Sequence, residues 1–275
     1  MTRTIVHYPQ DEMNSFLLPV TKGCSYNKCF FCTMYKDQIF EALPLRELEL
    51  VLMGADRYTE KVFLTGGDPL ALGYEELRKI LGLVNKYIPF CARVACYASV
   101  TNLKKFSLDQ LGILHDQGLR FLYIGFESGS DYALALMNKA HRKEEAIREA
   151  RKLNKAGLGF NSIILTGLAG RGRSLESARE TVEMLNSFSS QSIITMNLKI
   201  FQGSPLQKMA LAGSFELADQ AELLDELYYL VENLEVDKET IFDSSHPTNI
   251  FKIRGFLPQD RRKILNKLEA RRKSI

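Results

Sequence analysis

The 275-residue sequence lacks the features of secreted, membrane-spanning and zinc-hydrolase proteins. Its five cysteines are too few for a disulfide framework, and their odd number leaves one unpaired. The N-terminal stretch MTRTIVHYPQDEMNSF contains no apolar run of signal-peptide length, and no later segment is apolar enough over a sufficient length to span a bilayer. Four scattered histidines form neither an HxxxH nor an HExxH pair. We therefore expect a cytoplasmic protein in a reducing setting, without membrane association.

The charge of the chain is small in total but unevenly distributed. A formal net charge of +3 does not by itself indicate nucleic-acid binding. Residues 216–239 are almost purely acidic, whereas the C-terminal stretch carries, against the single Glu269, the basic residues Arg262, Lys263, Lys267, Arg271, Arg272 and Lys273. We interpret the two segments as amphipathic helices with solvated faces that pack near each other. The alternative is a basic C-terminal helix that contacts tRNA.

Three of the cysteines are clustered in the run TKGCSYNKCFFCTMYK. Cys24, Cys29 and Cys32 follow an apolar stretch, residues 16–20, that is typical of a strand. Thiolates at this spacing converge on one metal centre, because a short loop can wrap a single ion or cluster. A structural zinc site requires four protein ligands, so three thiolates leave one coordination position open. We favour an iron–sulfur cluster with one free iron. A zinc site completed by an outside ligand is the alternative.

One structural unit recurs along the chain: an amphipathic helix that ends at a glycine, followed by a short apolar strand that ends at another glycine. Residues 108–116 and 144–153 are such helices, and each is followed by a glycine suited to the left-handed C-cap conformation. Strands composed almost only of Ile, Leu, Val and Phe are buried on both faces, as in a parallel sheet covered by helices. The expected strands lie near 16–22, 61–65, 92–98, 120–126, 160–166 and 193–201.

These elements predict an α/β fold, a partial (β/α)6 TIM-like barrel with a C-terminal helical extension. We place the barrel in residues 1–213 and the extension, packed on the same domain, in 214–275. Within the extension, residues 216–235 are expected to form one helix, residues 241–258 a loop, and a terminal helix is expected to begin at Pro258. Ligands of such barrels bind at the C-terminal ends of the strands, where the cysteine loop and the glycine-rich segments also fall.

The motifs at these strand ends resemble those of radical S-adenosylmethionine (radical SAM) enzymes, most closely the branch of coproporphyrinogen oxidases, methylthiotransferases and elongator-type proteins. The resemblance covers about residues 14–210. It implies a [4Fe–4S] cluster held by three cysteines, with SAM chelating the fourth iron. It further implies an oxygen-sensitive oxidoreductase or transferase that cleaves SAM to a 5′-deoxyadenosyl radical, and an external electron donor such as flavodoxin or ferredoxin.

The resemblance assigns roles to individual residues. Cys24, Cys29 and Cys32 match the cluster ligands, and Phe31 matches an aromatic residue that packs by the adenine. In LTGGDPL, three residues match the glycine-rich motif that meets the methionine amino group of SAM: Gly66, Gly67 and Asp68. Simple loop packing is the alternative role of Phe31, and the motif GGDP is by itself a common turn.

Further along the chain, Glu127 and Ser128 match residues that contact the ribose or methionine part of SAM. Lys139 aligns with a basic residue that pairs with the SAM carboxylate, or else it is a solvated residue at a helix end. His141 is expected at the surface. The segment ILTGLAGRG resembles the family motif GLPG with Ala169 in place of proline. Residues 203–205 resemble the family turn PGTPL, which predicts a helix with a serine N-cap and a proline at its first position.

The sequence departs from the family pattern at three places. The first two cysteines are separated by four residues rather than three, Ile163 replaces an aspartate that binds the ribose, and Asp68 replaces the usual glutamate. Cys91 and Cys96 lie on the third expected strand, and we interpret them as buried small apolar residues. A different class of function also fits, an iron–sulfur or redox-sensing protein that never cleaves SAM. The substrate stays open among tetrapyrroles, modified tRNA, peptides and small metabolites.

Overall fold

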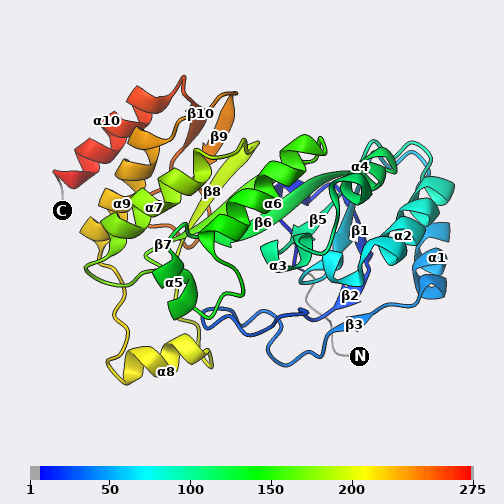
Figure 1. Cartoon of the computed structure of the whole chain (residues 1–275), viewed down its shortest axis with the longest axis horizontal. Helices are drawn as coiled ribbons and strands as arrows, with labels where there is room; N and C mark the ends of the chain where they lie inside the picture. The colour runs from blue at the N-terminus through cyan, green and yellow to red at the C-terminus, as the bar shows by residue number, and fades with distance from the viewer. Residues whose placement is uncertain (1–6, 274–275) are drawn as a thin grey trace. The chain divides into compact units, whose positions relative to one another are not determined.

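The computed structural model describes residues 7–273 of the chain (Figure 1). Residues 1–6, part of the segment inspected for a signal peptide and of the predicted barrel, and residues 274–275 of the predicted extension lie outside this description. The chain divides into two compact units. The first comprises residues up to Asn27, Tyr35–Ile124 and Lys152–Gly159, and the second comprises Lys28–Met34, Gly125–Arg151 and the residues from Phe160 onward.

The first unit is built on parallel strands. β4 (Lys61–Thr65) pairs with β1 (Phe16–Pro19) on one side and with β5 (Arg93–Ala98) on the other. β5 in turn pairs with β6 (Leu119–Glu127), whose last three residues belong to the second unit. A small antiparallel pair, β2 (Thr21–Lys22) and β3 (Glu41–Ala42), flanks the cysteine loop in the sequence. These positions match the expected strands to within about a residue, except that the first one is interrupted at Val20.

Helices of the first unit form where the sequence supplies an apolar stripe or a cap. In α2 (Tyr74–Tyr87) the buried residues follow the spacing of one helix face, and α4 (Leu108–Asp116) begins with a capping box at Ser107 and has the predicted bounds. The remaining short elements are η1 (Gln10–Glu12), α1 (Leu45–Met53), η2 (Pro69–Leu72) and α3 (Val100–Leu103).

The N-terminal part of the first unit is anchored by a buried carboxylate. Glu12 in η1 is fully buried, and it accepts hydrogen bonds from Ser15 and Tyr123 and pairs with Arg93 at 2.5 Å. Desolvation, followed by the hydrogen bonds to Glu12 and Asp11, raises the pKa of the Tyr123 phenol well above its usual value. This network ties η1 to β5 and β6.

The second unit contains strands that the sequence predicted and strands that it did not. β7 (Gly159–Thr166) and β8 (Ser192–Asn197) are parallel, as expected, although β8 ends at Asn197 rather than residue 201. β9 (Thr240–Asp243) pairs in parallel with β8, and β10 (Arg254–Leu257) pairs antiparallel with β9. The prediction of a plain loop over 241–258 is therefore wrong. Four-residue strands with polar ends give too short an alternation to be recognised.

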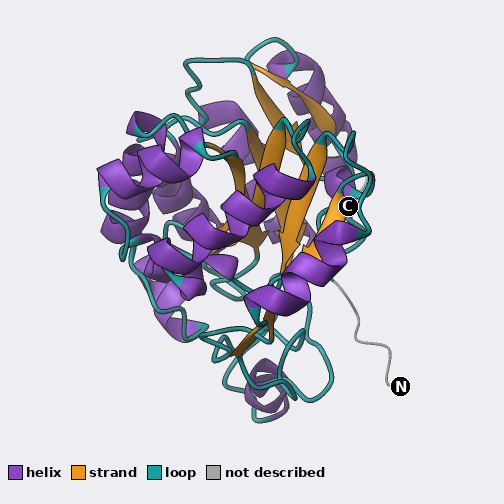
Figure 2. Ribbon diagram, turned by 90° about the vertical axis from the view of Figure 1, so that its right-hand side faces the viewer, coloured by secondary structure: helices purple, strands orange, loops and turns teal. Residues whose placement is uncertain are grey.

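Helices of the second unit begin where caps place them. Ser204 caps α8 (Pro205–Leu211), as predicted. α9 (Gln220–Asn233) begins only after the Asp219 capping box rather than at residue 216, and α10 (Arg261–Arg272) begins three residues after Pro258. The other helices are α5 (Asp131–Leu136), α6 (Lys143–Lys155) and α7 (Ser174–Leu185). Figure 2 shows helices lying against the strands.

The predicted α/β class with mainly parallel strands is confirmed, with the strand order β1-β4-β5-β6 in the first unit and β7-β8-β9-β10 in the second. The acidic and basic C-terminal helices pack on each other, as expected: Arg272 pairs with Asp225 at 2.6 Å, and Tyr228 donates a hydrogen bond to Glu269. The division of domains at residue 213 stays a prediction. No helix among residues 7–273 is long and apolar enough to cross a membrane.

Candidate cofactor site

The three clustered cysteines form no disulfide and are of intermediate exposure. Cys24 belongs to the first unit, whereas Cys29 and Cys32 belong to the second. Within residues 7–273, no group of three His, Cys, Asp or Glu side chains is arranged as around one metal ion. The two parts of the candidate site are therefore described separately.

In the first unit, the turn after β4 lies directly against Cys24. The Gly67 amide donates to the Gly23 carbonyl at 3.0 Å, and a Cβ atom added at Gly67 would lie 2.7 Å from the Cys24 Cβ. Gly66 has φ +137°, and a Cβ there would lie 1.9 Å from the Thr21 hydroxyl oxygen. Both positions need glycine because no side chain fits between the two chain segments. The cysteine loop and the glycine-rich segments were expected at the same ends of the strands, and the structure shows Cys24 next to Gly67.

Asp68 is a buried carboxylate with one oxygen unsatisfied. Oδ2 accepts hydrogen bonds from the Asn102 side chain at 2.6 Å and from the Ser99 amide at 3.2 Å, while Oδ1 is buried without a hydrogen-bond partner. Desolvation raises the pKa of Asp68 to about 6, against the hydrogen bonds from Ser99 and Asn102 that lower it. A buried acceptor without a partner is costly, so this oxygen is a candidate contact for a ligand donor.

In the second unit, main-chain hydrogen bonds hold the segment that carries Cys29 and Cys32. The Phe30 amide donates to the Met137 carbonyl and the Leu206 amide donates to the Phe30 carbonyl, both at 3.0 Å. Phe31 is partly buried against an apolar cluster comprising Ala133, Met137, Leu165, Leu168, Ala169, Leu198, Leu206 and Phe215. Phe31 therefore packs within the protein, which was the alternative to a contact with the adenine of SAM. The contact with adenine stays a prediction.

Glu127 and Lys139 form a largely buried ion pair at the end of β6. The Lys139 ammonium lies 3.1 Å from Glu127 Oε1 and donates to the Gly125 carbonyl at 3.3 Å, and each side chain is 11% exposed. Glu127 has φ +67°, a left-handed conformation that is costly for a residue with a side chain. The alternative interpretation of Lys139 as a solvated residue at a helix end is therefore wrong. Backbone strain at a strand end is typical of functional sites.

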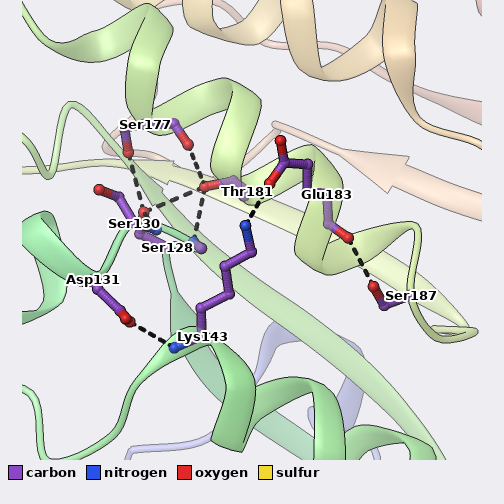
Figure 3. Close-up of polar contacts among 9 residues, drawn as sticks. Ser128, Ser130, Asp131, Lys143, Ser177, Thr181, Glu183 and Ser187 are labelled. Carbon is purple, nitrogen blue, oxygen red and sulfur yellow. Dashed lines mark hydrogen bonds and ion pairs between the residues drawn. The ribbon is translucent and has the colours of Figure 1, made fainter.

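Ser128 faces helix α7 in a buried network of hydroxyl groups (Figure 3). Its oxygen lies 3.0 Å from the Ser177 hydroxyl and 3.3 Å from the Thr181 hydroxyl, and it accepts a hydrogen bond from the Ser130 amide. A Cβ atom at Gly129 would lie 2.2 Å from the carbonyl oxygen of Glu180. Residues 128–130 thus pack against helix α7, which the sequence did not indicate. A cofactor contact by Ser128 stays a prediction.

Other predicted residues fall inside the protein. His141 is buried, with Nε2 3.2 Å from the Phe126 carbonyl, so the expectation of a surface position is wrong. Burial raises the pKa of both the Cys91 and the Cys96 thiols. Cys96 is fully buried on β5 as expected, whereas Cys91 is only partly buried and lies before the strand begins at Arg93, so the expectation for Cys91 is wrong. Near Ile163, β7 carries the buried Asn161, whose side-chain oxygen accepts a hydrogen bond from the Ser192 hydroxyl at 2.6 Å.

The loop after β7 has partners that the sequence did not reveal. The Gly167 amide donates a hydrogen bond to Glu226 Oε2 at 2.7 Å. Glu226 lies on α9 and is fully buried, and desolvation raises its pKa to about 8, with a further rise from Glu222 and an opposing effect of the Gly167 hydrogen bond. The periodicity of the segment predicted only an amphipathic helix, because a buried glutamate resembles its solvated neighbours in the sequence.

Comparison with known families and structures agrees with these motifs. The family described as the Radical SAM superfamily matches residues 18–185, which contain the cysteine cluster and the motifs after β4, β6 and β7. Among curated proteins, the chain is similar to the heme chaperone HemW of Bacillus subtilis (strain 168), with 21% identity over 232 residues. This match covers 84% of the chain and 59% of HemW.

Two solved structures share the fold. The radical SAM methyltransferase TsrM from Kitasatospora setae, solved with cobalamin and a [4Fe–4S] cluster bound, superposes with a TM-score of 0.58 and 16% identity over 70% of this chain and 38% of TsrM. Coproporphyrinogen III oxidase (HemN) from Escherichia coli, a radical SAM enzyme, has a TM-score of 0.57 and 14% identity over 79% of this chain and 51% of HemN. The matches thus cover 59% of HemW, 51% of HemN and 38% of TsrM, so the chain spans only part of the length of each of these proteins. Radical SAM neighbours of this kind bind a [4Fe–4S] cluster and SAM.

Proposed function

Because this chain belongs to the radical SAM superfamily, we propose that it is an enzyme that holds a [4Fe–4S] cluster through Cys24, Cys29 and Cys32 and cleaves SAM reductively. The observation that carries the proposal is the family match over residues 18–185, which includes all three cysteines. When bound, the cluster supplies the electron that splits SAM into methionine and a 5′-deoxyadenosyl radical, which then abstracts hydrogen from a substrate.

The residues of the cysteine loop fit a cluster. The three cysteines form no disulfide, and none of them is fully buried as Cys96 is. Cys24 is held by its close approach to Gly67, and the segment around Cys29 and Cys32 is fixed by main-chain hydrogen bonds to Met137 and Leu206. A three-thiolate donor set with an open position suits iron–sulfur chemistry with an external ligand. We propose that the loop holds the cluster although four residues, rather than the three of the family pattern, separate Cys24 from Cys29.

For SAM, the proposal uses residues from both units. In the first, the unpartnered Asp68 Oδ1 is suited to accept a hydrogen bond from the amino group of the methionine moiety, beside Gly66 and Gly67. In the second, Lys139 is suited to pair with the SAM carboxylate, and Glu127 holds it in place. Phe31 and Ser128 complete the proposed set, with Phe31 offering a ring edge or face to the adenine.

The electron has to reach the cluster from outside the chain, and we propose a protein donor such as flavodoxin or ferredoxin. Three segments of the second unit, residues 28–34, 137–142 and 198–213, contain no aspartate or glutamate. They carry the exposed cations Lys28, Arg142, Lys199 and Lys208. A basic surface next to the cysteine segment complements an acidic electron carrier. The oxygen sensitivity and the cytoplasmic location that we propose follow from the chemistry of such a cluster.

The similarity to HemW supports a second candidate function. HemW is described as a heme chaperone, so membership of the superfamily does not by itself establish hydrogen abstraction. In this alternative the chain binds a cluster but does not cleave SAM, and a tetrapyrrole is bound rather than converted. Tetrapyrroles, tRNA, peptides and small metabolites all stay candidates for the bound partner or substrate.

The test is SAM cleavage by the anaerobically reconstituted protein, measured as 5′-deoxyadenosine and driven once by dithionite and once by reduced flavodoxin. We expect cleavage with both reductants. The substitution Cys29→Ala should reduce 5′-deoxyadenosine to background and lower the iron and sulfide content, whereas Cys91→Ala, a thiol outside the cluster loop, should leave both unchanged.

Each other outcome selects an alternative. A full cluster without cleavage under either reductant would support the chaperone-like or sensing function. Cleavage with dithionite but not with flavodoxin would remove the flavodoxin-type donor. Stoichiometric zinc in place of iron, or retention of cluster and cleavage by Cys29→Ala, would contradict the main proposal.

A further inference from the structure

The loop after β7, residues 167–173, is held by acidic residues that lie some fifty residues further along the chain. At its start, the Gly167 amide donates to the buried carboxylate of Glu226 at 2.7 Å. At its end, the Gly172 amide donates to Glu222, one turn earlier on α9. Between them, the Arg171 amide donates to the Glu216 carbonyl at 2.9 Å, and the Arg171 guanidinium pairs with the Glu216 carboxylate. The acidic segment, which the sequence predicted only as an amphipathic helix with a solvated face, thus also holds this loop in place.

The loop packs so closely against residues 215–223 that two of its glycines have no room for a side chain. Gly167 has φ +77°, and a Cβ atom there would lie 2.9 Å from Leu223 Cδ2. Gly170 has φ +78°, and a Cβ atom there would lie 3.0 Å from the Phe215 ring and 3.1 Å from the Glu216 carbonyl. Main-chain N–H groups of such glycine-rich loops commonly bind anions, and here oxygen atoms of residues 216, 222 and 226 accept hydrogen bonds from three of them.

Among the residues that hold loop 167–173, we expect substitution of Glu226 to have the largest effect on the conformation of the loop. Arg171, Glu216 and Glu222 lie at the surface, where ion pairs contribute little. Glu226 is 2% exposed, and its removal would leave the Gly167 amide buried without an acceptor. Residue 167 is the first after β7, at the C-terminal strand end where ligands of such folds bind.

We propose that Glu226 is a positioning residue of the SAM site: its carboxyl group fixes the Gly167 amide and thereby the conformation of loop 167–173 that faces SAM. The inference rests on the proposed function, since it assigns the loop to SAM binding. The role requires an acceptor oxygen at this place rather than a negative charge. An amide side chain of the same shape therefore fulfils it, and a thioether of similar length does not.

The experiment compares Glu226→Met with Glu226→Gln in the reconstituted protein. The Met variant should bind SAM about tenfold more weakly by equilibrium titration, because a buried N–H loses its acceptor. Its KM for SAM should rise with little change in kcat, and the amide of Gly167 should exchange its hydrogen faster. The Gln variant should restore all three values to within about twofold of the wild type. Glu232→Met, the same substitution at an exposed position of α9, is the control.

The outcomes separate this inference from the proposed function. If the wild type neither binds nor cleaves SAM, the proposed function fails. If the wild type cleaves SAM and a folded Met variant, with normal iron content and a cooperative thermal transition, keeps the wild-type affinity for SAM, the inference is overturned. If the Met variant does not fold, the Glu226→Gln variant is the test. Wild-type SAM affinity in the Gln variant would support the inference that an acceptor oxygen is needed and a negative charge is not. A tenfold loss of SAM affinity in the Gln variant would contradict the inference.

Discussion

The two glycine-rich loops at the ends of β4 and β7 are built in opposite ways. The β4 loop, Gly66–Gly67–Asp68, is fixed by close approach to the neighbouring strand and to Cys24, and it leaves one carboxylate oxygen of Asp68 without a protein partner. The β7 loop has several of its main-chain N–H groups taken by groups of the segment 216–226. The first is held by sterics and presents an open acceptor, whereas the second is held by hydrogen bonds that the protein itself completes.

This difference indicates which loop contacts a ligand through polar atoms and which one shapes the surface around it. A buried acceptor left unpaired has a free-energy cost that a bound donor can remove. A loop whose N–H groups are satisfied gains nothing of that kind from a ligand. We therefore expect substitutions in the β4 loop to remove contacts with the cofactor directly, and substitutions at the β7 loop to weaken binding through the shape of the site.

The largest effect is expected for Gly67→Ala. The added Cβ would lie 2.7 Å from the Cys24 Cβ and 2.8 Å from the Gly23 carbonyl oxygen, so the cysteine segment has to move. We expect the iron content after reconstitution to fall severalfold and the free energy of unfolding to drop by about 1–3 kcal/mol. Gly112→Ala in α4, where nothing lies within 4 Å, is the matched control, with unchanged iron content and equal or slightly higher stability. Equal iron content in both variants would contradict the steric account.

A smaller effect is expected for Asp68→Asn, which keeps the shape of the side chain but removes its charge. Above its pKa of about 6 the ionised Asp68 carboxylate is a strong acceptor for a hydrogen bond from the SAM amino group, and this interaction weakens as the pH falls through 6 and the carboxyl group gains a proton. The dissociation constant of wild type for SAM should therefore be higher at pH 5.5 than at pH 7.5. The Asn variant should bind about tenfold more weakly at pH 7.5 and show no such dependence. The same pH dependence in both proteins would exclude Asp68 as the contact.

The smallest effect on SAM binding, within about twofold, is expected for Glu226→Gln, which instead changes the pH dependence of stability. Burial raises the Glu226 pKa to about 8, above its usual value of 4.5, so the native state binds a proton that the unfolded state releases. This contribution is fully present below pH 4.5 and is lost as the pH rises through 8, by at most about 1.4 kcal/mol per pH unit. Denaturant unfolding between pH 6 and 9 should show a shallower decline in the Gln variant. An unchanged slope would mean that Glu226 titrates near its usual pKa.

The same two loops illustrate which features of the structure could be predicted from the sequence and which could not. The strands were predicted almost to the residue, because apolar runs between glycines are a local signal, and the caps at Ser107 and Ser204 are local as well. The approach of Gly67 to Cys24 follows from the pairing of neighbouring strands. Glu226 could not be recognised, since its partner Gly167 lies 59 residues away. The hydroxyl network of Ser128 and the short strands β9 and β10 depend on tertiary packing in the same way.

The most direct test of the central claim is an EPR spectrum of the anaerobically reconstituted, dithionite-reduced protein, recorded with and without SAM. We predict a [4Fe–4S]⁺ signal whose g values change when SAM is added, because SAM binds the iron that Cys24, Cys29 and Cys32 leave open. A cluster signal that SAM does not alter, or reduced protein without any cluster signal, would contradict the account.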